Sequence, residues 1–169
     1  MADEKQIDVS RTVQAPPDQV FALLSDPKQH NAVDGSGTLR GTTSGPITGV
    51  GQVFWMEMYR DDLGPWATFN TVVEYEPGRA IGWAPVLDQD CPLAPKLAGI
   101  TTGGHTYTYR MRETGDGTEV RLTYDWSGVT DPKFEALVCP FVTREQLMDT
   151  LDRMADAAQP AAARSSDGS

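Results

Sequence analysis

The sequence predicts an α+β fold, in which a run of β-strands lies between short helices near the start and a longer helix near the end. First, apolar residues alternate over Ile7–Val13 and then change to helical spacing after Pro16 and Pro17. Second, segments of alternating apolar residues recur between residues 38 and 126. Third, an apolar stripe at helical spacing follows Thr143. These changes of period predict a strand, short helices, an antiparallel sheet and a closing helix, in that order.

The double proline and the residues after it predict two short helices. Proline needs no amide hydrogen in the first turn of a helix, so the first helix is expected to follow Pro16 and Pro17. A second helix is expected to begin at Pro27, with Ser25 or Asp26 as its cap. The turn Asp34–Gly37 then leads into a strand, because its glycines accept backbone angles that other residues resist.

The middle of the chain predicts a meander of antiparallel strands. The expected strands are Gln52–Tyr59, Ala67–Tyr75 and Ala80–Val86, followed by a hairpin of His105–Arg112 and Glu119–Trp126. The segment Leu87–Gly104 contains prolines and glycines and is longer than most connections within a domain. Its prolines and glycines would suit a mobile lid.

The last element is predicted to be an interrupted helix. Pro132–Val138 forms a short piece, and Pro140 breaks the pattern. The main helix restarts at Thr143, which has capping-box spacing to Gln146. Its apolar stripe reaches Ala158, so this helix is expected to lie across the concave face of the sheet.

Four segments carry a resemblance to a known family. They are IDVSRTVQAPPDQVFALL from Ile7, SDPKQHNAVDGSGTLRG from Ser25, EYEPGRAIGW from Glu74 and GGHTYTYRMRETGDGTEVRLTYDWSG from Gly103. Together they resemble the START-related lipid-binding superfamily (SRPBCC, helix-grip fold), in its polyketide cyclase/dehydrase-like branch. The resemblance runs from about Ile7 to Ala158 and contains no catalytic signature. It implies a curved antiparallel sheet wrapped around a long C-terminal helix, with an internal cavity for a small hydrophobic ligand.

Composition narrows the class of protein. The 169 residues fit one ligand-binding domain over residues 1–158, with a disordered tail at 159–169. A formal charge of -10 opposes the phosphate backbone, so no nucleic-acid partner is expected. No segment approaches the ~20 apolar residues of a membrane span, and MADEKQ lacks the apolar core of a signal peptide. We expect a cytoplasmic monomer or homodimer without stable membrane insertion.

Motifs for metals and cofactors are missing from the sequence. Cys91 and Cys139 are far apart, and the chain has only two histidines. The nucleotide, dinucleotide, serine-hydrolase and zincin spacings do not occur either. We therefore predict no metal site and no cofactor.

Aromatic residues in the strands are the candidate walls of the cavity. The candidates are Trp55, Tyr59, Trp83, Tyr107, Tyr109, Tyr124 and Trp126. Pockets for small molecules are commonly lined by aromatic side chains with a few polar groups. The alternative is that these rings simply fill the core.

Arg11 falls in the apolar phase of the first strand, which suggests a buried guanidinium. A buried guanidinium needs an anionic partner, and Glu57 or Asp34 is the candidate. We hypothesise that this pair lies in the cavity and orients the polar end of a ligand. The alternative is that Arg11 extends into solvent at a strand edge.

His30, Asp34, His105 and Tyr107 are the candidate catalytic residues. Only the two histidines titrate near neutral pH at their ordinary pKa, and His30 lies four residues before Asp34. Surface placement or a structural hydrogen bond is the alternative role for each histidine. If His30 and Asp34 both point into the cavity beside Arg11 or Glu57, catalysis is favoured.

Three functions remain open. We favour binding, transport or sensing of a lipid, polyketide, isoprenoid or aromatic compound, because apolar cavity candidates outnumber acid and base candidates. The alternative is an enzyme of the cyclase, aromatase or dehydratase type, which rests on analogy. A third possibility is a protein-interaction module of the toxin-antitoxin or chaperone-activator kind, which would have a collapsed cavity and an exposed apolar patch.

Overall fold

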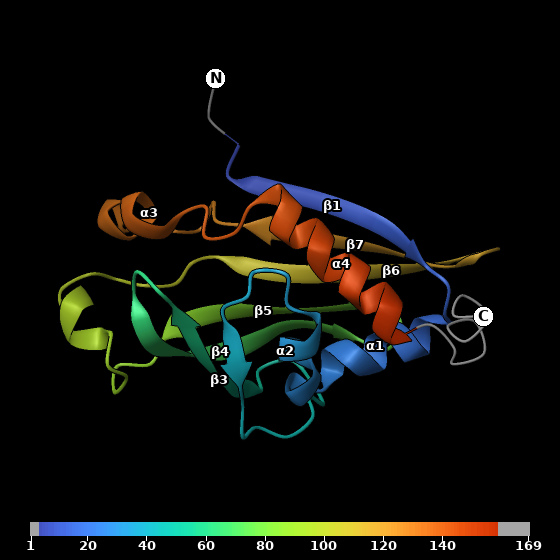
Figure 1. Cartoon of the computed structure of the whole chain (residues 1–169), viewed down its shortest axis with the longest axis horizontal. Helices are drawn as coiled ribbons and strands as arrows, with labels where there is room; N and C mark the ends of the chain where they lie inside the picture. Colours follow the sequence, from blue (N-terminus) through green and yellow to red (C-terminus); the bar gives the residue numbers. More distant parts are fainter. Residues whose placement is uncertain (1–3, 159–169) are drawn as a thin grey trace.

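The computed structural model describes residues 4–158, and within them one antiparallel sheet curves around the last helix (Figure 1). The seven strands lie in the order β1-β7-β6-β5-β4-β3-β2. Their bounds are β1 Gln6–Val13, β2 Leu39–Gly41, β3 Val53–Arg60, β4 Gly64–Glu76, β5 Ala80–Leu87, β6 Thr106–Thr114 and β7 Gly117–Asp125. The predicted tail, residues 159–169, lies outside the described residues.

The helices occupy the positions predicted by the changes in period. They are α1 Pro17–Ser25, α2 His30–Val33, α3 Pro132–Val138 and α4 Arg144–Ala158, with 3₁₀ turns η1 Pro27–Gln29 and η2 Ala94–Leu97. In Figure 1, α4 crosses one face of the sheet, and α1 and α2 lie near its C-terminal end. The α+β helix-grip fold is therefore confirmed.

Side-chain caps fix where two of the helical segments begin. The Asp26 carboxylate accepts a hydrogen bond from the Lys28 amide at 3.1 Å, so Asp26, and not Ser25, caps η1. Ahead of α4, the Thr143 amide donates to Gln146 Oε1 at 2.9 Å, and the Gln146 amide donates to Thr143 Oγ1 at 3.1 Å. This reciprocal pair is the predicted capping box.

The core lies between α4 and the concave face of the sheet. Its fully buried members include Val13 from β1, Val120 and Leu122 from β7, and Leu151 and Met154 from α4. The apolar stripe predicted for the last helix therefore faces the sheet. Near the N-terminus of α4, Leu147 lines a cavity that the core side chains do not fill.

Candidate functional site

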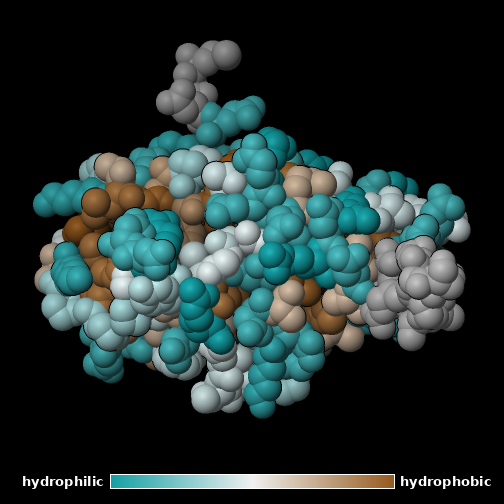
Figure 2. Space-filling view, in the orientation of Figure 1, coloured by the Kyte–Doolittle hydropathy of each residue, from teal (hydrophilic) through white to brown (hydrophobic). Residues whose placement is uncertain are grey.

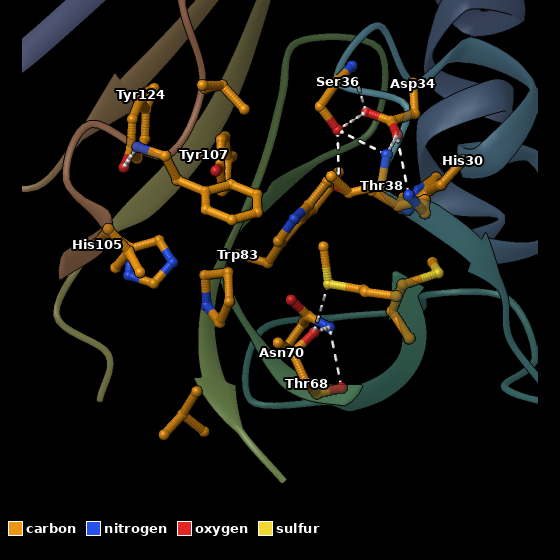
Figure 3. A pocket seen from close by; sticks show the side chains of 18 of the residues that line it. His30, Asp34, Ser36, Thr38, Thr68, Asn70, Trp83, His105, Tyr107 and Tyr124 are labelled. Atoms are coloured by element: carbon orange, nitrogen blue, oxygen red, sulfur yellow. Dashed lines mark hydrogen bonds between the residues drawn. The ribbon is translucent and has the colours of Figure 1, made fainter. Parts of the chain in front are cut away.

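An internal cavity of about 170 Å³ lies between the sheet, α4 and the connection from β5 to β6 (Figure 3). Strands β3 to β7 provide its walls, and α3 and α4 contribute Phe134, Val138 and Leu147. The connection contributes Leu93 and Leu97. Figure 2 shows hydrophobic surface gathered at the end of the molecule that carries α3 and η2.

Four of the predicted aromatic residues line this cavity: Trp83, Tyr107, Tyr109 and Tyr124. Tyr107 stacks on Tyr124 with ring centroids 4.8 Å apart. Tyr109 packs on Trp83 at 5.7 Å, and Trp83 stacks on His30 at 4.8 Å. The rings therefore brace one another and form a preformed wall; contact with a ligand stays a prediction.

The three tyrosine hydroxyls on this wall differ in their hydrogen bonding. Tyr124 Oη accepts a hydrogen bond from the Phe141 amide at 2.9 Å. The hydroxyls of Tyr107 and Tyr109 form no hydrogen bond within residues 4–158. Burial raises the pKa of both, and the negative charge of Asp34 adds to the shift, so both phenols stay protonated at neutral pH.

The Asp34 carboxylate organises the turn between α2 and β2. It accepts hydrogen bonds from the amides of Ser36, Thr38 and Leu39, each at 3.0 Å, and from the Ser36 hydroxyl at 2.6 Å. Both of its oxygens are therefore occupied by the turn itself. Asp34 lines the cavity, but its contacts are those of a structural residue.

Gly35 brings this turn directly against α4. Its amide donates to Thr150 Oγ1 at 2.9 Å. A Cβ atom at Gly35 would lie 2.2 Å from the Gln146 carbonyl oxygen, which real atoms do not allow. The absence of a side chain at Gly35 is therefore what lets the turn and α4 meet at the edge of the cavity.

His30 is buried and held by the backbone. Its Nε2 lies 2.7 Å from the Leu24 carbonyl oxygen, which only accepts hydrogen bonds, so Nε2 carries the proton. Burial lowers the pKa of His30 to about 4, against smaller raising effects from the Leu24 carbonyl, Asp26 and Asp34. No hydrogen bond joins His30 to Asp34 in the described chain. His30 is therefore a neutral ring on the cavity wall.

His105 lies among aromatic rings at the other end of the cavity. Its centroid is 5.9 Å from Phe134, 6.0 Å from Tyr107 and 6.2 Å from Tyr124. Its Nδ1 is buried without a hydrogen-bond partner among residues 4–158, and burial lowers its pKa to about 4. His105 is therefore neutral at physiological pH, and it lines the cavity with an Nδ1 that no described residue engages.

The expected placement of Arg11 in the cavity is wrong. Its Nη1 lies 2.5 Å from Asp152 Oδ1 on α4, and both side chains are partly exposed. Neither Glu57 nor Asp34 is its partner. The reason is that β1 is an edge strand, so its arginine reaches past the sheet to α4. The alternative was right that Arg11 lies partly exposed at a strand edge, but it did not include a partner on α4.

The expected phase of β3 is also wrong. Phe54, Met56 and Met58 line the cavity, so Trp55, Glu57 and Tyr59 point to the opposite face. Trp55 Nε1 donates to Asp88 Oδ2 at 3.0 Å, and the Tyr59 ring lies under the Arg40 guanidinium at 5.4 Å. Both phases of β3 contain large apolar side chains, including an aromatic ring in each, so local alternation does not distinguish the inward phase.

Trp126 does not line the cavity either. It is buried against Tyr124, with ring centroids 4.9 Å apart, just beyond the end of β7. Trp126 therefore fills the core, which was the alternative role for the aromatic candidates.

Two polar residues on the cavity wall were missed in the sequence. They are Thr68 and Asn70, which lie on the inward phase of β4 between apolar residues. Asn70 Nδ2 donates to the Phe54 carbonyl at 3.2 Å and to Thr68 Oγ1 at 3.1 Å. Polar residues in the buried phase of a strand are the signal that would have identified them.

Residues 4–158 contain neither a candidate metal cluster nor a candidate membrane span. No group of three or more His, Cys, Asp or Glu residues in this range could hold a metal ion. No helix in this range is long and apolar enough to cross a membrane.

Comparison with known proteins identifies related sequences. The family model described as "Polyketide cyclase / dehydrase and lipid transport" matches residues 4–159. An uncharacterized protein of Mycobacterium tuberculosis (strain ATCC 25618 / H37Rv) is 35% identical over 101 residues, which are 55% of this chain. The match spans 45% of that relative's own length.

Solved structures share the fold at low sequence identity. A protein from Arthrobacter aurescens is 13% identical with a TM-score of 0.69, covering 95% of this chain and 91% of its own. Protein Ms6760 from Mycobacterium smegmatis is 12% identical with a TM-score of 0.66, covering 92% and 91%. Ginseng major latex-like protein 151 from Panax ginseng is 12% identical with a TM-score of 0.59, covering 92% and 97%.

Proposed function

The chain belongs to the polyketide cyclase/dehydrase and lipid transport family, and we propose that it binds a small hydrophobic molecule in its internal cavity as a carrier or sensor. The observation that carries the proposal is the cavity of about 170 Å³ under α4, with its wall of stacked rings. Burial of an apolar ligand there gains about 25 cal/mol per Å² of surface removed from water. The braced rings keep the cost of ordering the site low.

Binding has more support than catalysis at this site. Both oxygens of Asp34 are engaged by the turn, and His30 Nε2 is engaged by a backbone carbonyl. His105 Nδ1 is buried, and neither Arg11 nor Glu57 lies beside these residues. A cyclase or dehydratase needs an acid or base within reach of the substrate. Their contacts therefore engage Asp34 and His30 in the fold, and the neutral ring of His105 and the protonated Tyr107 phenol do not form an acid/base pair with them.

Binding also has more support than the protein-interaction module, because the cavity is not collapsed. Some large apolar side chains are exposed, among them Val53 and Phe69. The open interior therefore favours a small ligand over a protein partner.

Mass spectrometry of an organic extract of the purified protein tests the proposal. We expect an apolar compound in stoichiometric amount, absent from an extract of an unrelated protein from the same host. A Met58→Trp variant should lose the compound, because Met58 lines the cavity and the larger ring occupies that space. A Val53→Trp variant is the matched control: it adds the same ring to the same strand, where the side chain is half exposed.

The two variants separate cavity binding from adsorption. The proposal fails if Met58→Trp, shown to be folded by its circular dichroism, retains as much compound as Val53→Trp. It also fails if neither the extract nor added naphthalene derivatives show any bound compound.

A further inference from the structure

The charge of the cavity wall carries a further inference about the ligand. Among the described residues, the lining contains no arginine and no lysine, and its one carboxylate is Asp34. Arg60 lies over the Phe141 ring at 5.1 Å, but two hydrogen bonds pair it with Asp62. An anion in this cavity would therefore be desolvated without a cation to compensate it.

The ionisable groups of the wall also disfavour an anionic ligand. His30 and His105 are buried in apolar surroundings and neutral, so they supply no positive charge at neutral pH. The negative charge of Asp34 is felt at the hydroxyls of Tyr107 and Tyr109, where it opposes loss of a proton. The same charge opposes an anionic group of a ligand at that place.

Two tyrosine side chains add hydrogen-bonding groups to a wall that also carries Asn70 and the Nδ1 of His105, which has no partner among the described residues. Tyr107 and Tyr109 alternate onto the same face of β6, and both line the cavity. Neither hydroxyl is used by a residue in the described chain, whereas Tyr124 is bonded to the Phe141 amide. A phenol that donates a hydrogen bond needs an acceptor, and a neutral carbonyl, ether or hydroxyl oxygen is a suitable one.

The volume limits the size of the ligand. An apolar cavity of about 150 Å³ holds one benzene ring. At about 170 Å³, this cavity has room for one ring or two fused rings.

We propose that the ligand is a neutral aromatic molecule of one or two rings, bearing an oxygen that accepts a hydrogen bond from Tyr107 or Tyr109, and that carboxylates are excluded. The inference rests on the proposed function, because it names the ligand class of the same cavity. This inference restricts the candidate ligands to molecules without an ionised group.

Equilibrium dialysis with three naphthalene compounds at neutral pH tests the inference. 2-Naphthamide carries a neutral carbonyl oxygen, 2-naphthoate places a carboxylate of nearly the same shape there, and naphthalene carries no polar group. We expect 2-naphthamide to bind most tightly. 2-Naphthoate should bind about tenfold or more weaker because of its uncompensated charge, and naphthalene about three- to tenfold weaker for lack of the hydrogen bond.

A double variant, Tyr107→Phe with Tyr109→Phe, assigns the hydrogen bond. It removes both hydroxyls and keeps both rings, so the stacked wall is preserved. The affinity for 2-naphthamide should fall to that for naphthalene, whose own affinity should not change. Tyr59→Phe is the matched control, because its hydroxyl lies on the opposite face of the sheet.

The possible outcomes separate this inference from the proposed function. If 2-naphthoate binds as tightly as 2-naphthamide, the exclusion of anions is overturned while cavity binding stands. If the double variant binds 2-naphthamide as tightly as the native protein, the role of the tyrosines is overturned. If none of the three compounds binds, the ligand class named here is overturned, while the proposed function is decided by the compound found in the organic extract.

Discussion

At the scale of single residues, His30 couples folding to pH. Its pKa in the folded protein is about 4, below its ordinary value of 6.5, because burial disfavours the charged ring. Between these two values the unfolded chain binds more protons than the folded protein does. The stabilisation is therefore complete above about pH 6.5 and is lost as the pH falls toward 4.

We expect the free energy of unfolding to decrease on acidification, with His30 contributing at most roughly 3 kcal/mol between neutral pH and its folded pKa. Urea unfolding at a series of pH values measures this slope. A His30→Gln variant does not titrate in this range, so its slope should be shallower. Parallel slopes for the two proteins would contradict the coupling, whatever the variant's absolute stability.

Single residues on the wall were predictable only where one strand phase was clearly apolar. β6 and β7 placed Tyr107, Tyr109 and Tyr124 on the cavity side. In β3, Trp55 and Phe54 make the two phases equally plausible, and the choice depends on which face α4 covers. Arg11 met Asp152 across 141 positions of the chain, a pairing that no local spacing contains.

At the scale of elements, the capping box determines where α4 begins. We expect Thr143→Ala to lower the free energy of unfolding by about 1 kcal/mol, because the Gln146 amide loses its acceptor. Chemical denaturation of the full chain measures the change. Thr130→Ala is the matched control, since Thr130 is exposed and caps no helix; an equal loss in both variants would rule out a specific contribution from the cap.

Strand boundaries were less predictable than helix starts. β4 begins at Gly64, three residues before the predicted Ala67. Gly64 and Pro65 have the composition of a turn, but β5 pairs with β4 only from Thr68 onward. Pro65 therefore lies where one side of β4 has no neighbour, and its missing amide hydrogen leaves no gap in that ladder.

At the scale of the whole molecule, the order of elements was predictable and the cavity was not. Changes of period and capping residues predicted the strands and helices along the chain. The empty volume is what remains after side chains from β3 to β7, α3, α4 and the β5–β6 connection have packed. The cavity volume is a small difference between the large volumes of the backbone frame and of the packed side chains. The pattern of apolar residues along the chain does not contain that difference.

The β5–β6 connection lies over the cavity and has the composition that would suit a lid. Leu93, Leu97 and Gly103 line the cavity. The Leu87 amide donates a hydrogen bond to Thr102 Oγ1 at 3.2 Å, which ties the two ends of the connection together. We expect 2-naphthamide to slow amide hydrogen exchange over residues 88–104. The β6–β7 turn at residues 114–117 is the internal control and should not change. Unchanged exchange in both segments, with the ligand shown to be bound, would contradict a lid.

The contact between Gly35 and α4 has a consequence for how the binding site arises during synthesis. The turn belongs to the first quarter of the chain, and α4 is the last described element. A nascent chain that ends before residue 142 has the tyrosines and tryptophan of the wall but neither Leu147 nor Thr150 to close it. On the proposed function, the site can therefore enclose a ligand only after α4 has been translated, because Leu147 and Thr150 complete its lining.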